Sequence, residues 1–429
     1  MSRRNRQKRA AKQKNRRRAS FRQGHWNTDP GYDRAAVLEH LIARLHHCAM
    51  CPDHDAESHA AELLDECRDR AQDLDVAADV AMTGAIGRAW QAGWAPNDLH
   101  EFARRRLDAS SAGYLAEAIV LESRQYAVTA LHPRWRAEVA ALSEGAVGGT
   151  PQMWGWAARI GVDDRAALTV VLTVLRFLGT LPILEPLLPL PGADQHAAVA
   201  TNEADAKVLS RVRGLLAKAE ATEFAEEAEA FSAKAQELMS RYSLDHAIQD
   251  HRRSGGAQAV ARRIWIDSPY VAAKATLVQS VATANRCRLV CAEKIGYVAV
   301  IGADCDVDFV ELLSTSLLVQ ANRAMLAAGR GTDGRHARTR SFRQSFLLAY
   351  AARIGERLTA TSATVATGMD RDALLPVLAA RSQATDDLTE RLFPRAVPRE
   401  MSISSGAGWS AGRTAADLAL LDVHRPIAG

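Results

Sequence analysis

Residues 207–245 read KVLSRVRGLLAKAEATEFAEEAEAFSAKAQELMSRYSLD, and this stretch decides the central part of the fold. Apolar residues recur at helical spacing in each half, with an interruption at residues 221–224. They are Val208, Val212, Leu215, Leu216 and Ala219 in the first half, and Ala228, Phe231, Ala235, Leu238 and Tyr242 in the second. Thr222 can cap the second helix, and Glu226 and Glu227 place negative charge at its positive end. The pattern predicts an αα-hairpin of helices of roughly 14 to 18 residues, which must bury its apolar faces on the rest of the chain or on a partner.

Three segments of this hairpin resemble a bacterial family called domain of unknown function 2786. They are LLAKAE (215–220), FAEEAEAF (224–231) and AKAQELMSRYSLD (233–245). A weaker likeness to the module that commonly follows the hairpin extends from Trp265 to Leu358, and another covers GWSAGR (408–413) with AAD (415–417). Ala225 stands where the family usually has proline, so the entry of the second helix is less rigid here. No catalytic or ligand residue is established for the family, so the resemblance implies a fold and no activity.

The composition indicates a globular protein with an uneven distribution of charge. Its 429 residues suffice for roughly three domains with a buried core. Residues 1–28 hold 11 Lys or Arg and no Asp or Glu, which leaves 43 basic and 50 acidic residues in the rest of the chain. Six cysteines are few for this length, and no apolar segment follows the charged N-terminus. We therefore expect reduced thiols and a cytoplasmic location.

The periodicity predicts a mainly α protein. We expect an N-terminal all-α domain, the central hairpin, and a small C-terminal β-α-β-β-α module with extra helices, all preceded by a disordered basic arm. The expected boundaries are 1–29 (arm), 30–180 (all-α domain), 181–206 (Pro- and Ala-rich linker), 207–250 (hairpin), 262–358 (α/β module) and 359–429 (helical extension). Predicted strands lie at 263–267, 288–291 and 297–301, and predicted helices at 271–284, 307–327, 342–358 and 412–421; residues 251–258 are expected to be a second linker.

Several familiar functional classes lack their sequence signatures. None of the eight lysines lies in a phosphate-binding P-loop, and the chain has no H-E-x-x-H, G-x-S-x-G or clear dinucleotide-binding motif. Residues 170–190 are apolar but contain Arg176, Glu185 and three prolines, which favours a buried helix and a linker over a membrane span. We expect no cofactor and lean against an enzyme.

The arm RRNRQKRAAKQKNRRR (3–18) carries the strongest functional signal. Ten cations without an acid repel one another unless an anion compensates them, and the phosphate backbone of DNA or RNA is the anion that fits best. An anionic membrane surface and a solvated tail without a dedicated partner are the alternatives. The predicted nucleic-acid-binding residues of the arm are Arg3, Arg4, Arg6, Lys8, Arg9, Lys12, Lys14, Arg16, Arg17 and Arg18.

A second basic cluster precedes and begins the predicted helix 342–358. It contains Arg335, His336, Arg338, Arg340 and Arg343, next to Phe342 and Phe346. Of these, Arg338, Arg340 and Arg343 are predicted to contact nucleic acid, the alternative being a solvated loop beside buried phenylalanines.

Three other patterns have both a functional and a structural interpretation. Cys48, Cys51, His54 and His59 have the residue types of a zinc site, but the central spacing is too short for a finger, so a helix end with exposed histidines competes. Asp304, Asp306 and Asp308 resemble the start of a calcium loop, but are better explained as charges at a helix N-terminus than as ligands of calcium or of a nuclease metal. Trp90 and Trp94 flank a predicted turn, which they should pack against the helices; a base-stacking surface is the alternative.

Taken as a whole, the sequence favours a cytoplasmic, non-enzymatic protein that associates with DNA or RNA through its arm, while the hairpin and the α/β module supply docking. One alternative is a hydrolase or nuclease that uses Glu226, Glu227 or the acids at 304–308. The other is a protein-interaction scaffold that binds a partner through the hairpin's polar face.

Overall fold

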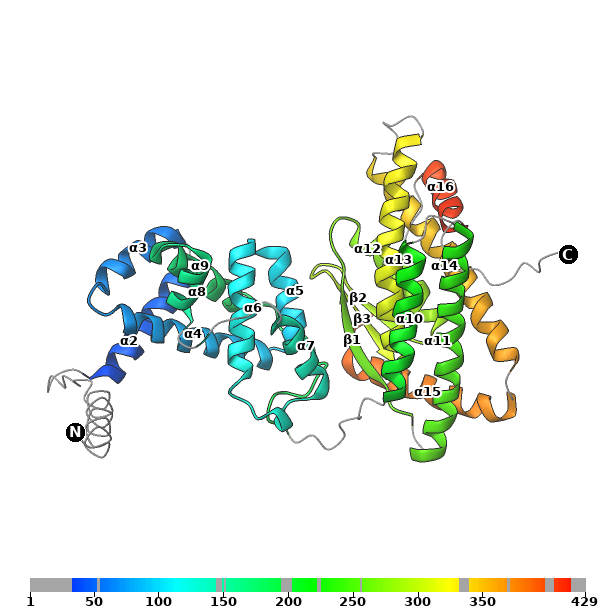
Figure 1. Ribbon diagram of the computed structural model, residues 1–429, viewed down its shortest axis with the longest axis horizontal. Coiled ribbons are helices and arrows are strands. Elements are labelled where there is room, and N and C mark those ends of the chain that lie inside the picture. Colours follow the sequence, from blue (N-terminus) through cyan, green and yellow to red (C-terminus); the bar gives the residue numbers. More distant parts are fainter. Residues whose placement is uncertain are drawn as a thin grey trace, which may run out of the picture. The chain divides into compact units, whose positions relative to one another are not determined.

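The computed structural model describes residues 33–51, 55–143, 149, 152–193, 203–221, 225–254, 257–331, 339–368, 371–397 and 405–417. The chain divides into two compact units, residues 1–85 with 148–179 and residues 86–147 with 180–429. The predicted mainly α class is confirmed, with a small three-stranded antiparallel sheet in the described part of the second unit (Figure 1). The predicted domain boundaries stay a prediction.

The first unit is helical throughout its described part. It contains α2 (Arg34–Met50), α3 (Ala56–Glu66), most of α4 (Ala71–Gln91), α8 (Met153–Ile160) and α9 (Asp164–Gly179). Asp33 caps α2 by accepting hydrogen bonds from the backbone N–H groups of Ala35 and Ala36. The stretch 170–190 is a buried helix up to Gly179 and irregular chain after it, as predicted. None of the described helices combines the length and the apolar character that crossing a bilayer requires.

The helical part of the second unit surrounds the turn between α4 and α5. It consists of the end of α4, α5 (Pro96–Arg106), α6 (Ala109–Ser123), η1 (Val128–Ala130) and α7 (Pro133–Ser143). Trp90 and Trp94 are both buried; Trp90 donates to Glu122 (3.0 Å) and Trp94 to the carbonyl of Pro182 (2.9 Å). The two tryptophans therefore pack the turn, as predicted.

The sheet belongs to a β-α-β-β-α unit whose order matches the prediction. It runs β1 (Val260–Trp265), α12 (Val271–Ala284), β2 (Arg288–Ala292), β3 (Tyr297–Gly302) and α13 (Asp304–Gly331). The strand order is β1-β3-β2, and both pairs are antiparallel. Every residue of β3 is buried, because α12 and α13 pack on the sheet from one side and α15 (Arg371–Leu392) packs from the other. As in any strand, successive side chains of β1 point to opposite faces of the sheet.

The predicted αα-hairpin is present as α10 (Glu203–Ala221) and α11 (Ala225–Ser254). Val212, Leu216 and Ala235 are buried in one core with the α/β unit, α14 (Arg340–Thr367) and α16 (Gly406–Asp417), so the hairpin finds its partner within the chain. The predicted length of the second helix was wrong. α11 has 30 residues and continues to Ser254, through the first half of the expected linker at 251–258, because the buried Leu244 and Ala247 extend its apolar face.

The last helix also begins earlier than predicted. α16 starts at Gly406 rather than at Gly412, because Ser405 begins it by accepting a hydrogen bond from the N–H of Gly408 (3.2 Å). The chain from 418 to 421, where the predicted helix ended, lies outside the described residues.

Candidate nucleic-acid interface

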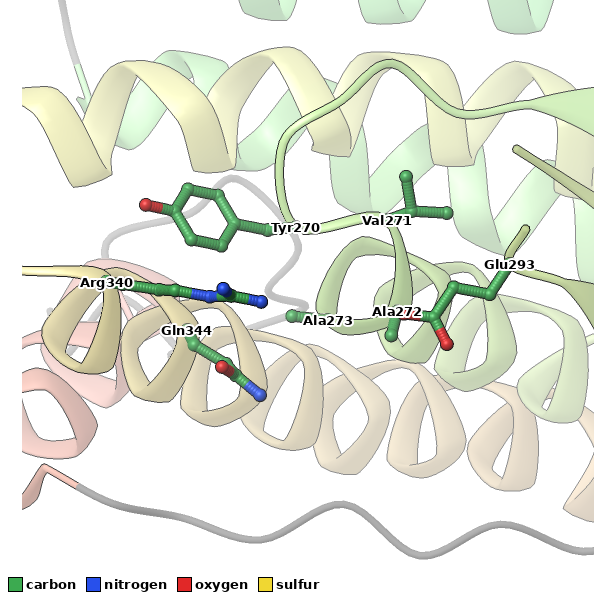
Figure 2. A pocket seen from close by; sticks show the side chains of 7 residues that line it. All are labelled: Tyr270, Val271, Ala272, Ala273, Glu293, Arg340 and Gln344. Carbon is green, nitrogen blue, oxygen red and sulfur yellow. The ribbon is translucent and has the colours of Figure 1, made fainter. Parts of the chain in front are cut away.

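Two adjoining hollows lie in the second unit, beside the N-terminal half of α12. The larger, which we call the groove, has a volume of about 1070 Å³ and lies between α12, β2, α14, the segment 392–397 and Trp409 of α16. The smaller, which we call the pocket, has a volume of about 220 Å³ and is lined by Tyr270, Val271, Ala272, Ala273, Glu293, Arg340 and Gln344 (Figure 2). Ala272 and Glu293 line both hollows, so the two are neighbouring parts of one cleft.

Close packing of α16 on α14 brings Trp409 to the groove. A Cβ added at Gly408 would overlap the carbonyl oxygen of Phe342, and one added at Gly412 would overlap that of Phe346. Only glycine therefore permits the two helix backbones to approach this closely. Trp409 lies between these glycines and is partly exposed, so its ring is available as a wall of the groove.

The pocket is built at the start of two helices. Tyr270 precedes α12 and has a left-handed backbone (φ 70°, ψ 34°), which is uncommon for a residue with a large side chain. Thr339 caps α14 by accepting a hydrogen bond from the N–H of Phe342 (3.2 Å), which makes Arg340 the first helical residue. Figure 2 shows the Tyr270 ring and the Arg340 guanidinium on one side of the pocket and the Glu293 carboxylate on the opposite side. Charged groups of opposite sign thus face one ligand-sized space.

The remaining cleft residues combine apolar, aromatic and cationic side chains. Phe393 and Arg395 belong to the segment after α15, and with Trp409 they line the groove. Other lining residues are apolar or small and include Ala275, Leu289 and Leu348. Two arginines and one glutamate line the cleft, so its charged groups favour an anionic ligand, while its rings favour one with flat, apolar faces.

The predicted nucleic-acid-binding residues have three different outcomes. All ten of the arm, together with Arg338, lie outside the described residues. Arg340 lines the pocket. Arg343 lies on the same helix, half-buried, and lines neither hollow. The sequence did not predict the cleft residues Tyr270, Gln344, Phe393, Arg395 and Trp409. Trp409 lies in the GWSAGR segment, which indicated a family likeness but no binding role.

The acids at 304–308 are surrounded by arginines. Arg262 of β1, whose side chain is 9% exposed, forms ion pairs with Asp304 (2.5 Å) and Asp308. Asp306 lies 3.7 Å from both Arg286 and Arg381. Burial raises the pKa of Asp304. Asp304 and Asp306 stand in the first turn of α13, which agrees with their interpretation as helix-starting charges.

The zinc hypothesis concerned residues of the first unit. Cys48 is buried on α2, Cys51 ends that helix, and His59 lies on α3, 3.5 Å from Glu62. His54 lies outside the described residues. Within the residues that the structure describes, no three or more His, Cys, Asp or Glu side chains are grouped so that they could hold a metal ion.

A second charged region of the second unit lies on the opposite face of the sheet from α13. Arg263, whose side chain is 1% exposed, donates to Asp98 (2.6 Å) and to the carbonyl oxygens of Gly93 and Glu185. Trp265 donates to the other oxygen of Asp98 (2.8 Å). We call these residues the Arg263 cluster. Its hydrogen bonds tie β1 to the α4–α5 turn, so its charges serve structure.

Glu138 of α7 adjoins this cluster. It accepts hydrogen bonds from the N–H of Asn97 (3.1 Å) and from Arg134 (3.1 Å). Burial, followed by the charge of Asp98, raises the pKa of Glu138 to about 7. A carboxyl group in this setting titrates near neutral pH, which couples the stability of the helical part to pH.

Comparison with known proteins identifies one segment of the chain. No curated protein and no solved structure matches the chain. Residues 207–246 match the family described as "Protein of unknown function (DUF2786)", so the hairpin of α10 and α11 is a domain of that family.

Proposed function

We propose that this protein binds single-stranded nucleic acid, with the cleft holding bases and the basic arm holding phosphates. The observation that carries the proposal is the combination, in one cleft, of Arg340 beside Tyr270 with Phe393 and Trp409 along the adjoining groove. Cations that follow the backbone and aromatic rings that stack on bases are the two elements of proteins that bind single strands.

The form of the cleft favours a single strand over a duplex. Bases of a duplex are stacked inside it, whereas those of a single strand can turn outward and enter a hollow. The groove walls are mostly apolar, and each base that stacks on a ring contributes about 1 to 3 kcal/mol. Arg340 and Arg395 supply positive charge at the cleft. A strand would therefore be held by stacking on the faces of its bases and by attraction to its phosphate backbone.

The arm adds affinity that does not depend on sequence. Ten Lys or Arg over residues 3–18 release counterions when they neutralise phosphates, which makes binding steeply dependent on salt. The arm and the cleft therefore make separable contributions: the arm determines most of the salt dependence, and the cleft determines the preference for unpaired strands.

The acids at 304–308 do not favour the alternative of a hydrolase or nuclease. Such a site needs carboxylates available to a metal ion or to water, and Asp304 and Asp308 are paired with Arg262. The scaffold alternative places a protein partner on the hairpin's polar face. It predicts binding of that partner that does not require Arg340.

The test is binding of the full chain to fluorescent oligonucleotides of about 12 nucleotides, measured by anisotropy at about 50 and 200 mM salt. Single-stranded RNA, single-stranded DNA and duplex DNA are compared. We expect single strands to bind more tightly than the duplex, and Arg340→Ala to lower single-strand affinity about tenfold, the cost of one charge-assisted contact. Arg323→Ala on α13 removes an exposed arginine that lines neither hollow and should change nothing.

Deleting residues 1–22 separates the two contributions. We expect the truncated chain to bind more weakly, with less salt dependence, and to keep its preference for single strands. If deletion abolishes all binding while Arg340→Ala leaves it unchanged, the arm alone binds nucleic acid and the cleft has another role. Failure of every single strand to bind would overturn the proposal.

A further inference from the structure

We propose that the exposed face of α10 is a phosphate-binding surface, which holds the backbone of a nucleic-acid strand outside the cleft. The inference rests on the proposed function for its ligand, but its residues line neither hollow. Lys207, Arg211 and Lys218 are exposed at positions i, i+4 and i+11, so they form one row along the helix, which we call the α10 stripe. At 1.5 Å per residue the stripe is about 16 Å long.

The packing of α10 determines where the stripe faces. Val212 and Leu216 are buried in the core that the hairpin shares with the α/β unit and α14. An α-helix turns by about 100° per residue, so the stripe lies on a different side of α10 from these two residues. The neighbouring helix α11 packs along α10 (Figure 1). The core therefore holds one side of α10 and leaves the cations in solvent.

The cations of the stripe lack acidic partners, unlike those of α11. On α11, Lys234 and Arg241 are also exposed, but both form ion pairs with Glu237, at 2.8 and 3.3 Å. Within the part of the chain that the structure describes, no Asp or Glu pairs with a residue of the stripe. Lys218 lies over the ring of Phe231 (5.6 Å), a contact that leaves its net charge uncompensated.

The sequence of α10 concentrates this charge in its middle. Residues 206–219 contain four Lys or Arg and no Asp or Glu, and the acids of α10 lie nearer its two ends. Lys207 and Arg211 are one helical turn apart, where like charges repel and weaken a helix. An anion that contacts both side chains removes this repulsion. The arrangement therefore favours a ligand with several negative charges in a row.

The residues around the stripe favour a phosphate backbone over an acidic protein surface. The other exposed residues between Lys207 and Lys218 are Ser210, Arg213, Gly214 and Ala217. None of them carries a large apolar or aromatic side chain, which the centre of a protein–protein interface needs. Contacts to phosphates need only cations and small polar side chains such as serine. Nucleic acid is thus the polyanion that this face fits.

The test measures how the affinity of the full chain depends on salt. Lys207→Gln, Arg211→Gln and Lys218→Gln are combined in one variant, because glutamine removes the charge and keeps a good helix former. Anisotropy is measured with a single strand of about 12 nucleotides and with a duplex of the same length, between about 50 and 200 mM salt. Each neutralised phosphate of a single strand contributes about 0.7 to the slope of log affinity against log salt.

We expect the triple variant to reduce this slope by about 2 for the single strand, and to bind about 10- to 100-fold more weakly at about 50 mM salt. Both strand types should lose affinity similarly, because both carry phosphates, so the preference for single strands should persist. Arg340→Ala, which alters the cleft, should instead reduce that preference.

Two control variants separate the stripe from overall charge. Arg241→Gln removes an exposed arginine of the same hairpin that is paired with Glu237, so it should keep the wild-type slope. A variant that combines Lys207→Arg, Arg211→Lys and Lys218→Arg keeps every charge and should bind like wild type. Hydrogen exchange of the buried strand β3 verifies that each variant is folded.

The outcomes distinguish this inference from the proposed function. If single strands bind but the triple variant keeps the wild-type slope, the stripe contacts no phosphate, an acidic protein becomes its partner, and the proposed function stands. An equal loss per charge in Arg241→Gln would also overturn the assignment to the stripe. If only the duplex binds, the proposed function fails, while the slope for the duplex still decides whether the stripe contacts phosphate. If neither binds, both fail.

Discussion

The Arg263 cluster and the cleft both contain arginine, carboxylate and aromatic side chains, yet they have opposite physical characters. In the cluster, the side chain of Arg263 is 1% exposed and donates hydrogen bonds to Asp98 and to two carbonyl groups. In the cleft, Arg340 is exposed and faces Glu293 across an open pocket. Residue type alone therefore does not mark a binding site. What marks it is whether the charged groups face each other closely enough to pair or across a space that a ligand can fill.

The energetics of the two regions should differ in the same way. Removing one partner of a buried ion pair leaves the other uncompensated in a medium of low polarity. Removing an exposed charge changes stability little, because water already screens it. The predictions that follow use this difference, from the largest expected effect to the smallest.

Arg263→Met should destabilise the second unit by about 3 to 5 kcal/mol, because Asp98 would keep its charge without its cation. The free energy of opening is measured by hydrogen exchange of β3, which reports on this unit alone. Arg395→Met, at an exposed position, is the matched control and should stay within about 0.5 kcal/mol of wild type. Equal effects of the two substitutions would remove the distinction between the regions.

Glu138 should make the second unit less stable as pH rises. Its pKa in the folded protein is about 7, above its ordinary value, so between about pH 4.5 and 7 the folded state holds a proton that the unfolded state has lost. Stability therefore falls across this window, by on the order of 2 to 3 kcal/mol from this group. The measurement is hydrogen exchange equilibria at pH 5 and 8, corrected for intrinsic exchange, and Glu138→Gln should lose this part of the pH dependence. A variant with the wild-type slope would contradict the assignment.

Gly412→Ala should destabilise the packing of α16 on α14 by about 1 to 3 kcal/mol, because the added Cβ overlaps the backbone of Phe346. It should also weaken single-strand binding, since Trp409 would shift from the groove. Gly214→Ala is the control: no atom lies near its added Cβ, so alanine should stabilise α10 by about 0.5 to 1 kcal/mol and leave binding unchanged. Thermal unfolding and oligonucleotide anisotropy measure the two effects.

Arg340→Ala should have the smallest effect on stability, within about 0.5 kcal/mol, while it lowers affinity for single strands about tenfold. Arg263→Met, by contrast, is predicted to cause a large loss of stability. A large loss of stability in Arg340→Ala would mean that this arginine, like Arg263, has a structural partner and that the two regions are alike.

Local patterns predicted much of the fold. The hairpin and the β-α-β-β-α order followed from periods of 3.6 and 2, which depend on neighbouring residues. Helix ends were less accurate: α11 continues because Leu244 and Ala247 find a core that only the folded chain provides. The acids at 304–308 were correctly placed at a helix start, but their arginine partner is on β1, some 40 residues earlier in the chain.

The cleft could not be predicted from the sequence. Its walls come from residues 270–279, 289–293, 340–352, 392–397 and 409, and no local pattern relates them. Arg340 was found because clustered charge is visible in the sequence itself. Tyr270 carried no signal, since its role depends on a left-handed backbone and on a neighbour 70 positions away.

The most direct test of the central claim is photocrosslinking of the full chain to single-stranded RNA that contains 4-thiouridine, with the crosslinked peptides identified by mass spectrometry. We predict crosslinks in the peptides that contain Tyr270, Phe393 or Trp409, and their loss when unlabelled single strands compete. Crosslinks confined to residues 1–28, with none in these peptides, would contradict the claim that the cleft holds the bases.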